Sequence, residues 1–212
     1  HSRADMVEKV NLLANRIPMV VTGKLDGTGC YQVQIDDAEC MDLIMDHLVG
    51  LGHKRIGVIG GSMDILSTFG KFQRYRELLD RYGIPYLPEL VGKDGGYDAD
   101  TGYREMKAML HRGADPTAVI AVNDFTAVGV MKCIQEASLR IPDDISVVSY
   151  DDTYITDLMT PPLTSIAYHY RHFGKVLVET AIGAIEGKEL PKRQLIKPEL
   201  MVRGSSGRVK TP

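Results

Sequence analysis

Short apolar runs alternate along this chain with longer stretches in which apolar residues recur at helical spacing. The clearest case lies in residues 116–152, where two β-branched runs, 118–122 and 145–150, flank a helical repeat at 126–136. A strand, a helix and a strand in this order require a crossover connection, which makes the two strands parallel. The pattern therefore predicts a β-α-β unit at the centre of the fold.

Polar side chains follow both strands of this unit. Asn123 and Asp124 come after the first strand, and Asp151 and Asp152 close the second. Because the carboxyl ends of parallel strands share one edge of a sheet, an amide and carboxylates converge there, as in the ligand crevices of open α/β sheets. Each residue also has an ordinary structural explanation, since Asn caps helices and Asp begins turns. The pattern alone leaves both interpretations open.

The alternation continues on both sides of the central unit. The remaining predicted helices are 4–15, 38–51, 69–82, 98–112 and 171–186, and the remaining strands are 18–22, 31–35, 55–59, 89–91, 165–168 and 195–202. Gly60-Gly61-Ser62 has neither Walker nor GxGxxG spacing, so we expect a tight turn there and not a phosphate cradle. Strict alternation from 31 to 150 predicts an α/β fold with a mainly parallel, doubly wound sheet, and the outer segments are expected to form a second sheet.

Composition narrows the class of protein. The 212 residues carry a net charge of −3, which gives no reason to expect broad affinity for nucleic acid or anionic lipid. Three cysteines without CxxC spacing favour a reducing compartment. No apolar run is long enough for a membrane span, and the start HSRADMVEKV lacks the apolar core of a signal peptide. We expect a soluble, cytoplasmic protein without membrane contact.

Catalytic motifs are missing from the sequence. It contains no GxSxG elbow, no HExxH and no Cys/His spacing for a metal. The nearest cluster is Asp46, His47 and His53 at a predicted helix end, where bonding to the helix terminus is the favoured explanation. We therefore expect no enzyme activity, no metal and no cofactor.

Four phrases carry a resemblance to a known family. The chain looks like the effector-binding core of the lactose-repressor (LacI/GalR) family of bacterial transcriptional regulators over nearly its whole length. The phrases are HLVGLGHKRIGVIGG (47–61), PTAVIAVNDFTAVGVMKCIQEASLRIPDDISVVSYDD (116–152), PPLTSI (161–166) and PELMVRGSS (198–206).

The resemblance implies a type I periplasmic-binding-protein-like fold of two subdomains. Three crossovers are expected near residues 35–36, 166–167 and 193–194, with the effector in the cleft between the lobes. Residues 1–35 and 167–193 would form a partial N-terminal subdomain, 36–166 and 194–204 the C-terminal subdomain, and 205–212 a polar tail. The family's DNA-binding domain, through which operator DNA would be bound, is expected to be absent from this chain.

The resemblance also places ligand contacts. Asn123 and Asp151 fall where the family has an amide and a carboxylate that hydrogen-bond ligand hydroxyls. The other implied effector-binding residues are a cleft serine, a cation and two aromatic walls, namely Ser67, Lys71, Tyr97 and Tyr170. Lys71 stands where many members have Arg, and Gly23-Lys24 stands where sugar-binding members can have Asp. A sugar is the first expectation, with an acidic sugar, a sugar phosphate or a non-sugar metabolite left open.

Self-association has its own signal in helix 126–136, which is apolar on more than one side. Val128 and Met131 lie off the face expected to pack on the sheet, and Tyr154, Leu158 and Met159 follow in a loop. The resemblance places a homodimer contact there, whereas packing within one chain is the alternative. The expected function is the effector-binding and dimerisation core of a regulator. A secreted solute-binding protein of a transport system is the alternative, because fold alone does not separate the two.

Overall fold

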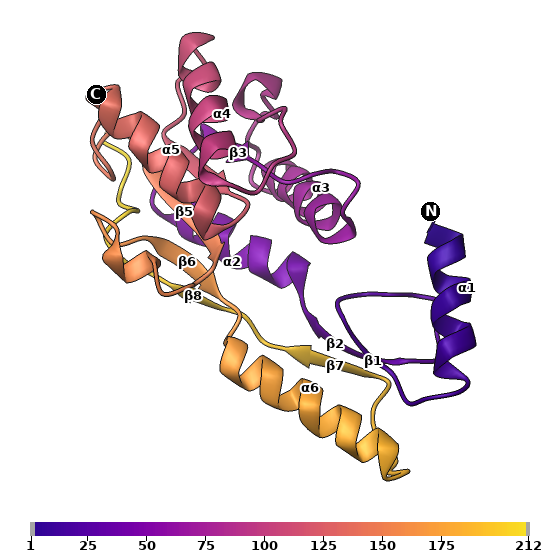
Figure 1. Cartoon of the computed structure of the whole chain (residues 1–212). Coiled ribbons are helices and arrows are strands. Elements are labelled where there is room, and N and C mark those ends of the chain that lie inside the picture. Colours follow the sequence, from indigo (N-terminus) through magenta and orange to yellow (C-terminus); the bar gives the residue numbers. More distant parts are fainter. Residues whose placement is uncertain (1–2, 211–212) are drawn as a thin grey trace. The chain divides into compact units, whose positions relative to one another are not determined.

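The computed structural model describes residues 3–210 and divides the chain into two compact units (Figure 1). The smaller unit contains the chain up to Asp36 together with Tyr168–Pro198. The larger unit contains Asp37–Ala167 and the chain from Glu199 onward. The third passage between units thus lies at 198–199 and not at the expected 193–194, because the strand that starts at Arg193 pairs inside the smaller unit.

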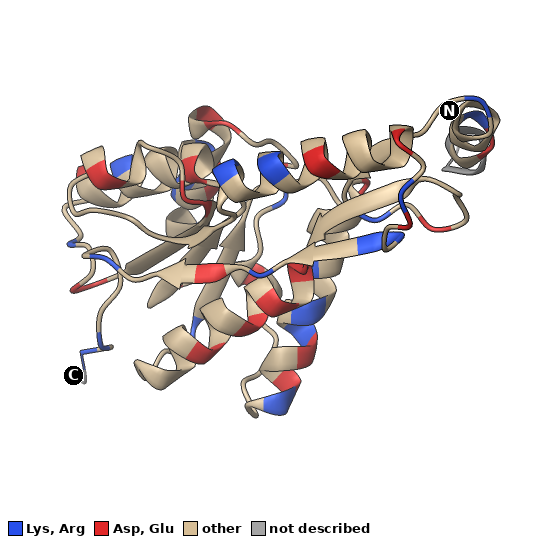
Figure 2. Ribbon diagram, turned by 90° about the horizontal axis from the view of Figure 1, so that it is seen from below, with Lys and Arg blue, Asp and Glu red and all other residues tan. Residues whose placement is uncertain are grey.

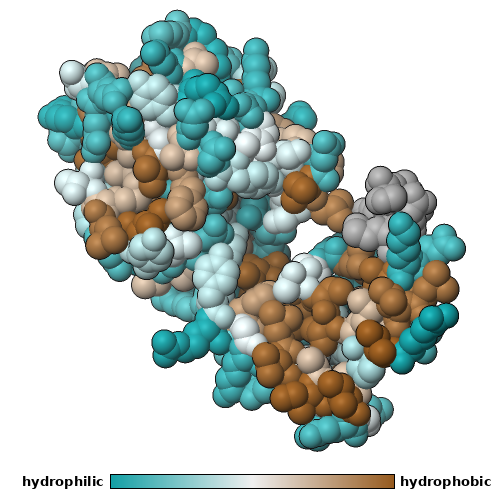
Figure 3. Space-filling model, in the orientation of Figure 1, coloured by the Kyte–Doolittle hydropathy of each residue, from teal (hydrophilic) through white to brown (hydrophobic). Residues whose placement is uncertain are grey.

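The smaller unit is a three-stranded parallel sheet with two helices. Its strands are β1 (Val20–Thr22), β2 (Tyr31–Ile35) and β7 (Arg193–Ile196), in the order β1-β2-β7, and its helices are α1 (Arg3–Ala14) and α6 (Tyr170–Ile185). Helix α6 packs against β1 and β2. Large apolar side chains remain exposed on this unit (Figure 3), namely Leu12, Leu13, Ile17, Val178, Ile182, Ile185 and Leu195.

The larger unit is built on a five-stranded sheet. Its strands are β3 (Ile56–Ile59), β4 (Ala118–Ala121), β5 (Ser146–Asp151), β6 (Thr164–Ala167) and β8 (Glu199–Met201), in the order β3-β4-β5-β6-β8. The first four are parallel and β8 runs antiparallel to β6. The predicted α/β class and the central β-α-β unit are confirmed.

Helices cover both faces of the larger sheet. They are α2 (Asp37–Gly50), α3 (Leu66–Arg81), α4 (Ala99–His111) and α5 (Asp124–Glu136), with short 3-10 helices η1 (Pro88–Leu90) and η2 (Thr156–Leu158). α2 packs on α3, and α4 packs on α5. The fully buried Met106 and Val130 lie in one core cluster with Val119 and Val147 of the sheet, whereas Tyr75 of α3 donates to the carbonyl of Ile56 at 2.7 Å.

Acidic and basic residues are interspersed along the helices in Figure 2, without a face of one sign in that view. Within residues 3–210, no helix is both long and apolar enough to cross a bilayer.

Two glycines let α4 and α5 cross in close contact. A Cβ atom at Gly129 would lie 1.7 Å from the carbonyl oxygen of Ala99, and one at Gly102 would lie 2.0 Å from that of Thr126. Real Cβ atoms essentially never approach other atoms below 3.0 Å, so only glycine permits this contact. The crossing lies near the first turn of both helices and brings their amino ends together.

Two predicted strands are wrong in detail. The segment 89–91 forms η1 because Pro88 starts a turn, and only Val91 reaches β3, through a single bridge to Val58. The segment 195–202 is split into β7 and β8, which belong to different sheets. Pro198 has no N–H to donate, so the ladder is interrupted there.

The segment expected to be a polar tail is packed on the larger unit. Ser205 is fully buried, and its hydroxyl donates to the carbonyl of Val147 at 2.6 Å and accepts from the N–H of Thr164 at 2.8 Å. The ring of His47 lies 2.9 Å from the hydroxyl of Ser206. The described part of the tail, up to residue 210, therefore belongs to the fold of this unit.

Candidate functional site

The carboxyl ends of β3, β4 and β5 lie at one edge of the larger sheet, which we call the rim. Register pairs Ile120 with Val148, so Asn123 after β4 and Asp151 at the end of β5 reach the same level of the sheet. Tyr97 joins them from the loop before α4, because the side-chain amide of Asn123 donates to its carbonyl at 3.0 Å. The rim thus brings together an amide, a carboxylate and an aromatic ring that the sequence had nominated.

Asn123 performs the capping role that the sequence left open. Its backbone is extended (φ −158°, ψ 173°), and its Oδ1 accepts from the N–H of Thr126 at 2.8 Å, as an N-cap residue does. Capping and ligand contact are compatible, because an Asn amide has two N–H donors and two acceptor lone pairs. The cap and the bond to the Tyr97 carbonyl together orient Asn123, and one donor and one lone pair of its amide remain.

Asp151 and Asp152 have different roles although they are neighbours. Their φ angles are +100° and +48°, a left-handed backbone that non-glycine residues rarely adopt. The carboxylate of Asp152 is paired with Arg203 at 2.7 Å, and both side chains are mostly buried. Asp152 is thus held within the protein, whereas the role of Asp151 in ligand binding stays a prediction. Strained backbone of this kind is typical of functional sites.

Lys71 and Ser67 converge on a carboxylate that the sequence analysis had not nominated. The Ser67 hydroxyl donates to Oδ1 of Asp37 at 2.7 Å, and the Lys71 ammonium lies 3.5 Å from the same oxygen. The ammonium also lies 4.2 Å from the centre of the Tyr150 ring, and the Lys71 side chain is only 12% exposed. The charge of Lys71 is thus offset within the protein.

Asp37 could have been found from spacing. Ser67 and Lys71 are four residues apart on α3 and share one face of that helix, so a single partner can contact both. Asp37 directly precedes the predicted helix 38–51, where an acidic residue at the amino end already has a local explanation. The structure places it in the first turn of α2, where its carboxylate is also favoured by the helix dipole.

Tyr97 is fixed by its hydroxyl and leaves its ring accessible. The hydroxyl accepts from the N–H of Ser62 at 3.1 Å and lies 2.8 Å from the hydroxyl of Thr68, while the side chain as a whole is 39% exposed. The same loops and helix starts expose further apolar side chains, namely Met63, Ile65, Leu66, Phe69 and Phe125. The larger unit therefore offers both hydrogen-bonding groups and apolar surface around the rim.

Gly60 and Gly61 follow β3 in an irregular segment that only glycine accommodates easily. Both residues have positive φ (+87° and +86°), and a Cβ atom at Gly60 would lie 2.8 Å from Val122. A cavity of about 240 Å³ lies between this turn and the loop 92–95. This cavity lies at the β3 end of the rim, and neither Asn123 nor Asp151 lines it.

Several nominated residues lie elsewhere. Tyr170 begins α6 of the smaller unit and is 51% exposed, so its place in the site stays a prediction. Lys24, also in the smaller unit, is an exposed side chain paired with Asp26 at 3.5 Å. Neither residue is brought to the rim by the fold of the larger unit itself.

The nominated dimer surface needs one correction. Met131 is 2% exposed and belongs to the core cluster, because α5 is covered by α4 as well as by the sheet. The second apolar face of α5 is therefore buried within the chain at Met131, and this residue is not available to a second copy. Val128 and Met159 are partly buried, whereas Tyr154 is 80% and Leu158 74% exposed.

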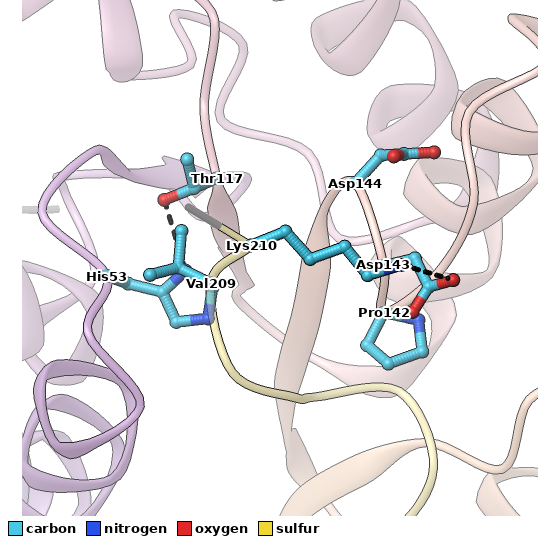
Figure 4. A pocket seen from close by; sticks show the side chains of 7 residues that line it. All are labelled: His53, Thr117, Pro142, Asp143, Asp144, Val209 and Lys210. Atoms are coloured by element: carbon cyan, nitrogen blue, oxygen red, sulfur yellow. Dashed lines mark hydrogen bonds and ion pairs between the residues drawn. The ribbon is translucent and has the colours of Figure 1, made fainter. Parts of the chain in front are cut away.

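His53 of the nominated Asp46, His47 and His53 cluster lies at the opposite edge of the sheet, beside Thr117 (Figure 4). His53 is 1% exposed, and its ring nitrogens lie 3.1 Å from the Thr117 hydroxyl and 2.9 Å from the carbonyl of Gly207. Burial lowers the pKa of His53, and repulsion from His47 lowers it further, against the raising effect of the Gly207 carbonyl. In residues 3–210, no group of His, Cys, Asp and Glu forms a metal-binding cluster. These histidines hold the C-terminal segment.

Comparison with known proteins identifies the family to which the chain belongs. The family of periplasmic binding protein-like domains matches residues 45–206. The lactose operon repressor of Escherichia coli K12 is 30% identical over 194 residues, which cover 92% of this chain and 53% of that protein. The ribose operon repressor of the same strain is 33% identical over 166 residues, covering 78% and 50%. The chain thus spans about half the length of the curated relatives it matches.

Solved structures of similar proteins match over most of the chain. A dimeric Lac repressor with an 11-residue C-terminal deletion aligns with a TM-score of 0.90 and 28% identity, covering 98% of this chain and 75% of that one. The complex of the regulator CelR with cellobiose aligns with a TM-score of 0.79 and 29% identity, covering 88% and 58%. These relatives are transcriptional repressors and regulators, not enzymes.

Proposed function

Because the chain belongs to the family of periplasmic binding protein-like domains and is the effector-binding core of a LacI/GalR-type regulator, we propose that its rim binds a neutral, hydroxyl-rich metabolite. The observation that carries this proposal is the pairing of Lys71 with Asp37 beside the rim, because this pair offsets the cation there. Asp151 and Asn123 are the proposed ligand contacts. A sugar fits these groups best.

Charge distinguishes a neutral ligand from an anionic one. Asp37 and Asp151 contribute two carboxylates, whereas Lys71 is 12% exposed and already shared between Asp37 and the Tyr150 ring. A carboxylate accepts strong, charge-assisted hydrogen bonds from ligand hydroxyls but repels a ligand carboxylate or phosphate. The acidic sugar and the sugar phosphate that the sequence left open are thereby disfavoured.

The names of relatives support the same ligand class. Those proteins are described as repressors of the lactose and ribose operons, and one solved relative was determined with cellobiose. By analogy we propose that effector binding shifts an equilibrium between two conformations of the whole protein and so changes its binding to operator DNA. The DNA contact would be made by a part of the protein outside this chain.

Self-association is proposed through the exposed loop that follows β5. Tyr154 and Leu158 are the most exposed large apolar side chains of the larger unit, and Phe125 at the start of α5 is half exposed. Exposed apolar residues of this kind are typical of protein interfaces. A second copy of the chain is the proposed partner.

A thermal-shift screen followed by calorimetry tests the ligand class. D-ribose, lactose and cellobiose are compared with D-gluconate and glucose 6-phosphate, and the proposal expects stabilisation by a neutral sugar. Asp151→Asn should then weaken binding by about 1.5–3 kcal/mol, the value of a hydrogen bond to a charged group. Asp143→Asn is the control, because Asp143 pairs with Lys210 at the opposite edge. Stabilisation by the anionic compounds alone, or unchanged sugar affinity in Asp151→Asn, would contradict the proposal.

A further inference from the structure

A buried carboxylate lies directly behind the rim. Asp124 follows Asn123 in the first turn of α5 and is fully buried. Its Oδ1 accepts from the hydroxyls of Ser149 at 2.6 Å and Ser165 at 2.8 Å. Its Oδ2 accepts from the N–H of Thr153 at 2.7 Å and from the Thr153 hydroxyl at 2.8 Å. Asp124 therefore connects α5 with β5, β6 and the loop after β5.

These bonds hold the backbone immediately after Asp151. The Ser165 hydroxyl donates to Asp124 and accepts from the N–H of Asp152 at 3.1 Å. The next N–H along the chain, that of Thr153, donates to Asp124 directly. Two consecutive backbone amides after Asp151 are thus tied to one buried network, at the place where φ is +100° and then +48°. Strained conformations persist only where the surroundings hold them in this way.

We propose that Asp124 is a positioning residue of the effector site, which imposes the left-handed turn at 151–152 and thereby aims the Asp151 carboxylate at the ligand. The importance of Asp124 for ligand binding rests on the proposed function, whereas its effect on the backbone at 151–152 does not. Asp124 reaches no ligand itself, because it is fully buried and all its contacts are with the protein.

The chemistry requires a carboxylate at this position. Four donors face Asp124, and an ionised carboxylate is an acceptor at both oxygens. In Asp124→Asn, the amide NH₂ would replace one of these acceptors and face a hydroxyl or an N–H that also donates. The substitution preserves size and shape, so its effect isolates the loss of acceptors.

NMR of the ligand-free chain tests the backbone effect. A residue with positive φ gives a strong intraresidue N–H to Hα contact and a small coupling between these protons, which an extended residue does not. The wild type should show this signature at Asp151, and Asp124→Asn should lose it. Asp100→Asn is the matched control, because Asp100 is also in the first turn of a helix but is solvent-exposed. Retention of the signature in a folded Asp124→Asn overturns the proposal.

Milder variants keep the test decisive if Asp124→Asn does not fold. Ser165→Ala removes the acceptor of the Asp152 N–H, and Thr153→Val removes one donor to Asp124 while keeping the N–H bond. Ser165→Ala should weaken the signature at Asp151 more than Thr153→Val does. If both variants keep the positive-φ signature of the wild type at Asp151, the proposal is overturned.

Calorimetry then measures the consequence for binding. Each variant is titrated with D-ribose, lactose and cellobiose, and the sugar that binds the wild type is used. Asp124→Asn should weaken its binding by roughly tenfold or more. In the Asp151→Asn background the same change should cost less than about twofold, because the residue it positions is already disabled. A merely structural role would give the same loss in both backgrounds, which would refute positioning. If no sugar binds the wild type, the proposed function fails, while the NMR result still decides the backbone effect.

Discussion

Replacing Gly129 by alanine tests whether the close crossing of α4 and α5 holds the larger unit together. The new Cβ would lie 1.7 Å from the backbone oxygen of Ala99 and 2.6 Å from the nitrogen of Tyr103. Because both are main-chain atoms inside a helix, no side-chain rotation relieves the contact. Reaching the 3.0 Å that real Cβ atoms require means parting the helices by about 1.3 Å at this point.

The magnitude follows from two opposing contributions. Overpacking a core costs typically about 1–3 kcal/mol, and a clash between two main chains belongs at or above the upper end of that range. Alanine is favoured over glycine in a helix by about 1 kcal/mol, which offsets part of the loss. We expect Gly129→Ala to lower the free energy of unfolding by about 2 kcal/mol or more, and Tm by roughly 5 °C or more.

The control is Gly70→Ala in α3, where no atom lies within 4 Å of the added Cβ. This variant should gain about 0.5–1 kcal/mol from helix propensity alone. Both free energies are measured by urea unfolding followed by circular dichroism. If Gly129→Ala is as stable as Gly70→Ala, the close crossing does not exist in solution and the reasoning is refuted.

Three further outcomes are expected. Because the pKa of His53 is lowered in the folded state, the unfolded chain binds more protons than the folded chain, and stability should fall as the pH drops below about 6.5. His53→Gln should flatten this pH dependence, as measured by urea unfolding between pH 7.5 and 5.5. Met131→Ala should lower the free energy of unfolding by about 2–5 kcal/mol, because Met131 is buried in the core. Tyr154→Asp should leave stability unchanged and shift the sedimentation coefficient toward that of the monomer. The reverse pattern would place the interface on α5. Tyr75→Phe should cost about 1 kcal/mol by leaving the Ile56 carbonyl unpaired, and an unchanged melting curve would argue against that bond.

The layout of the fold was predictable because helical and strand periods differ. Strands β4 and β5 and helix α5 follow from apolar spacing alone, and the crossover rule makes the strands parallel. The prediction of a strand at 89–91 was wrong because the apolar residues of this segment are compatible with either a strand or a turn, and Pro88 favours the turn. The break at Pro198 was visible in the sequence, but the change of sheet that accompanies it was not.

The site was predictable only in part. Topology places Asn123 and Asp151 at one edge of the sheet, but it does not show that Asn123 also caps α5. Asp37 was not nominated, and Asp124 was grouped with the polar residues at the sheet edge without a separate role, because a carboxylate in the first turn of a helix has a sufficient local explanation. Their other partners come from distant segments, α3 for Asp37 and β5 and β6 for Asp124, and no local pattern reports such contacts.

The docking of the C-terminal segment has a practical consequence for building a biosensor. The last residue that the structure describes is Lys210, which pairs with Asp143 before β5, beside the buried imidazole of His53 (Figure 4). A fluorescent reporter fused after this point would leave the larger unit at the amino ends of its strands, which is the edge of the sheet opposite to Asn123 and Asp151. The same fusion would strain the contacts by which His47 and His53 hold the segment. Because burial lowers the pKa of both histidines, these contacts are formed with neutral rings, and neutral or mildly alkaline buffer is the sensible working condition for such a device.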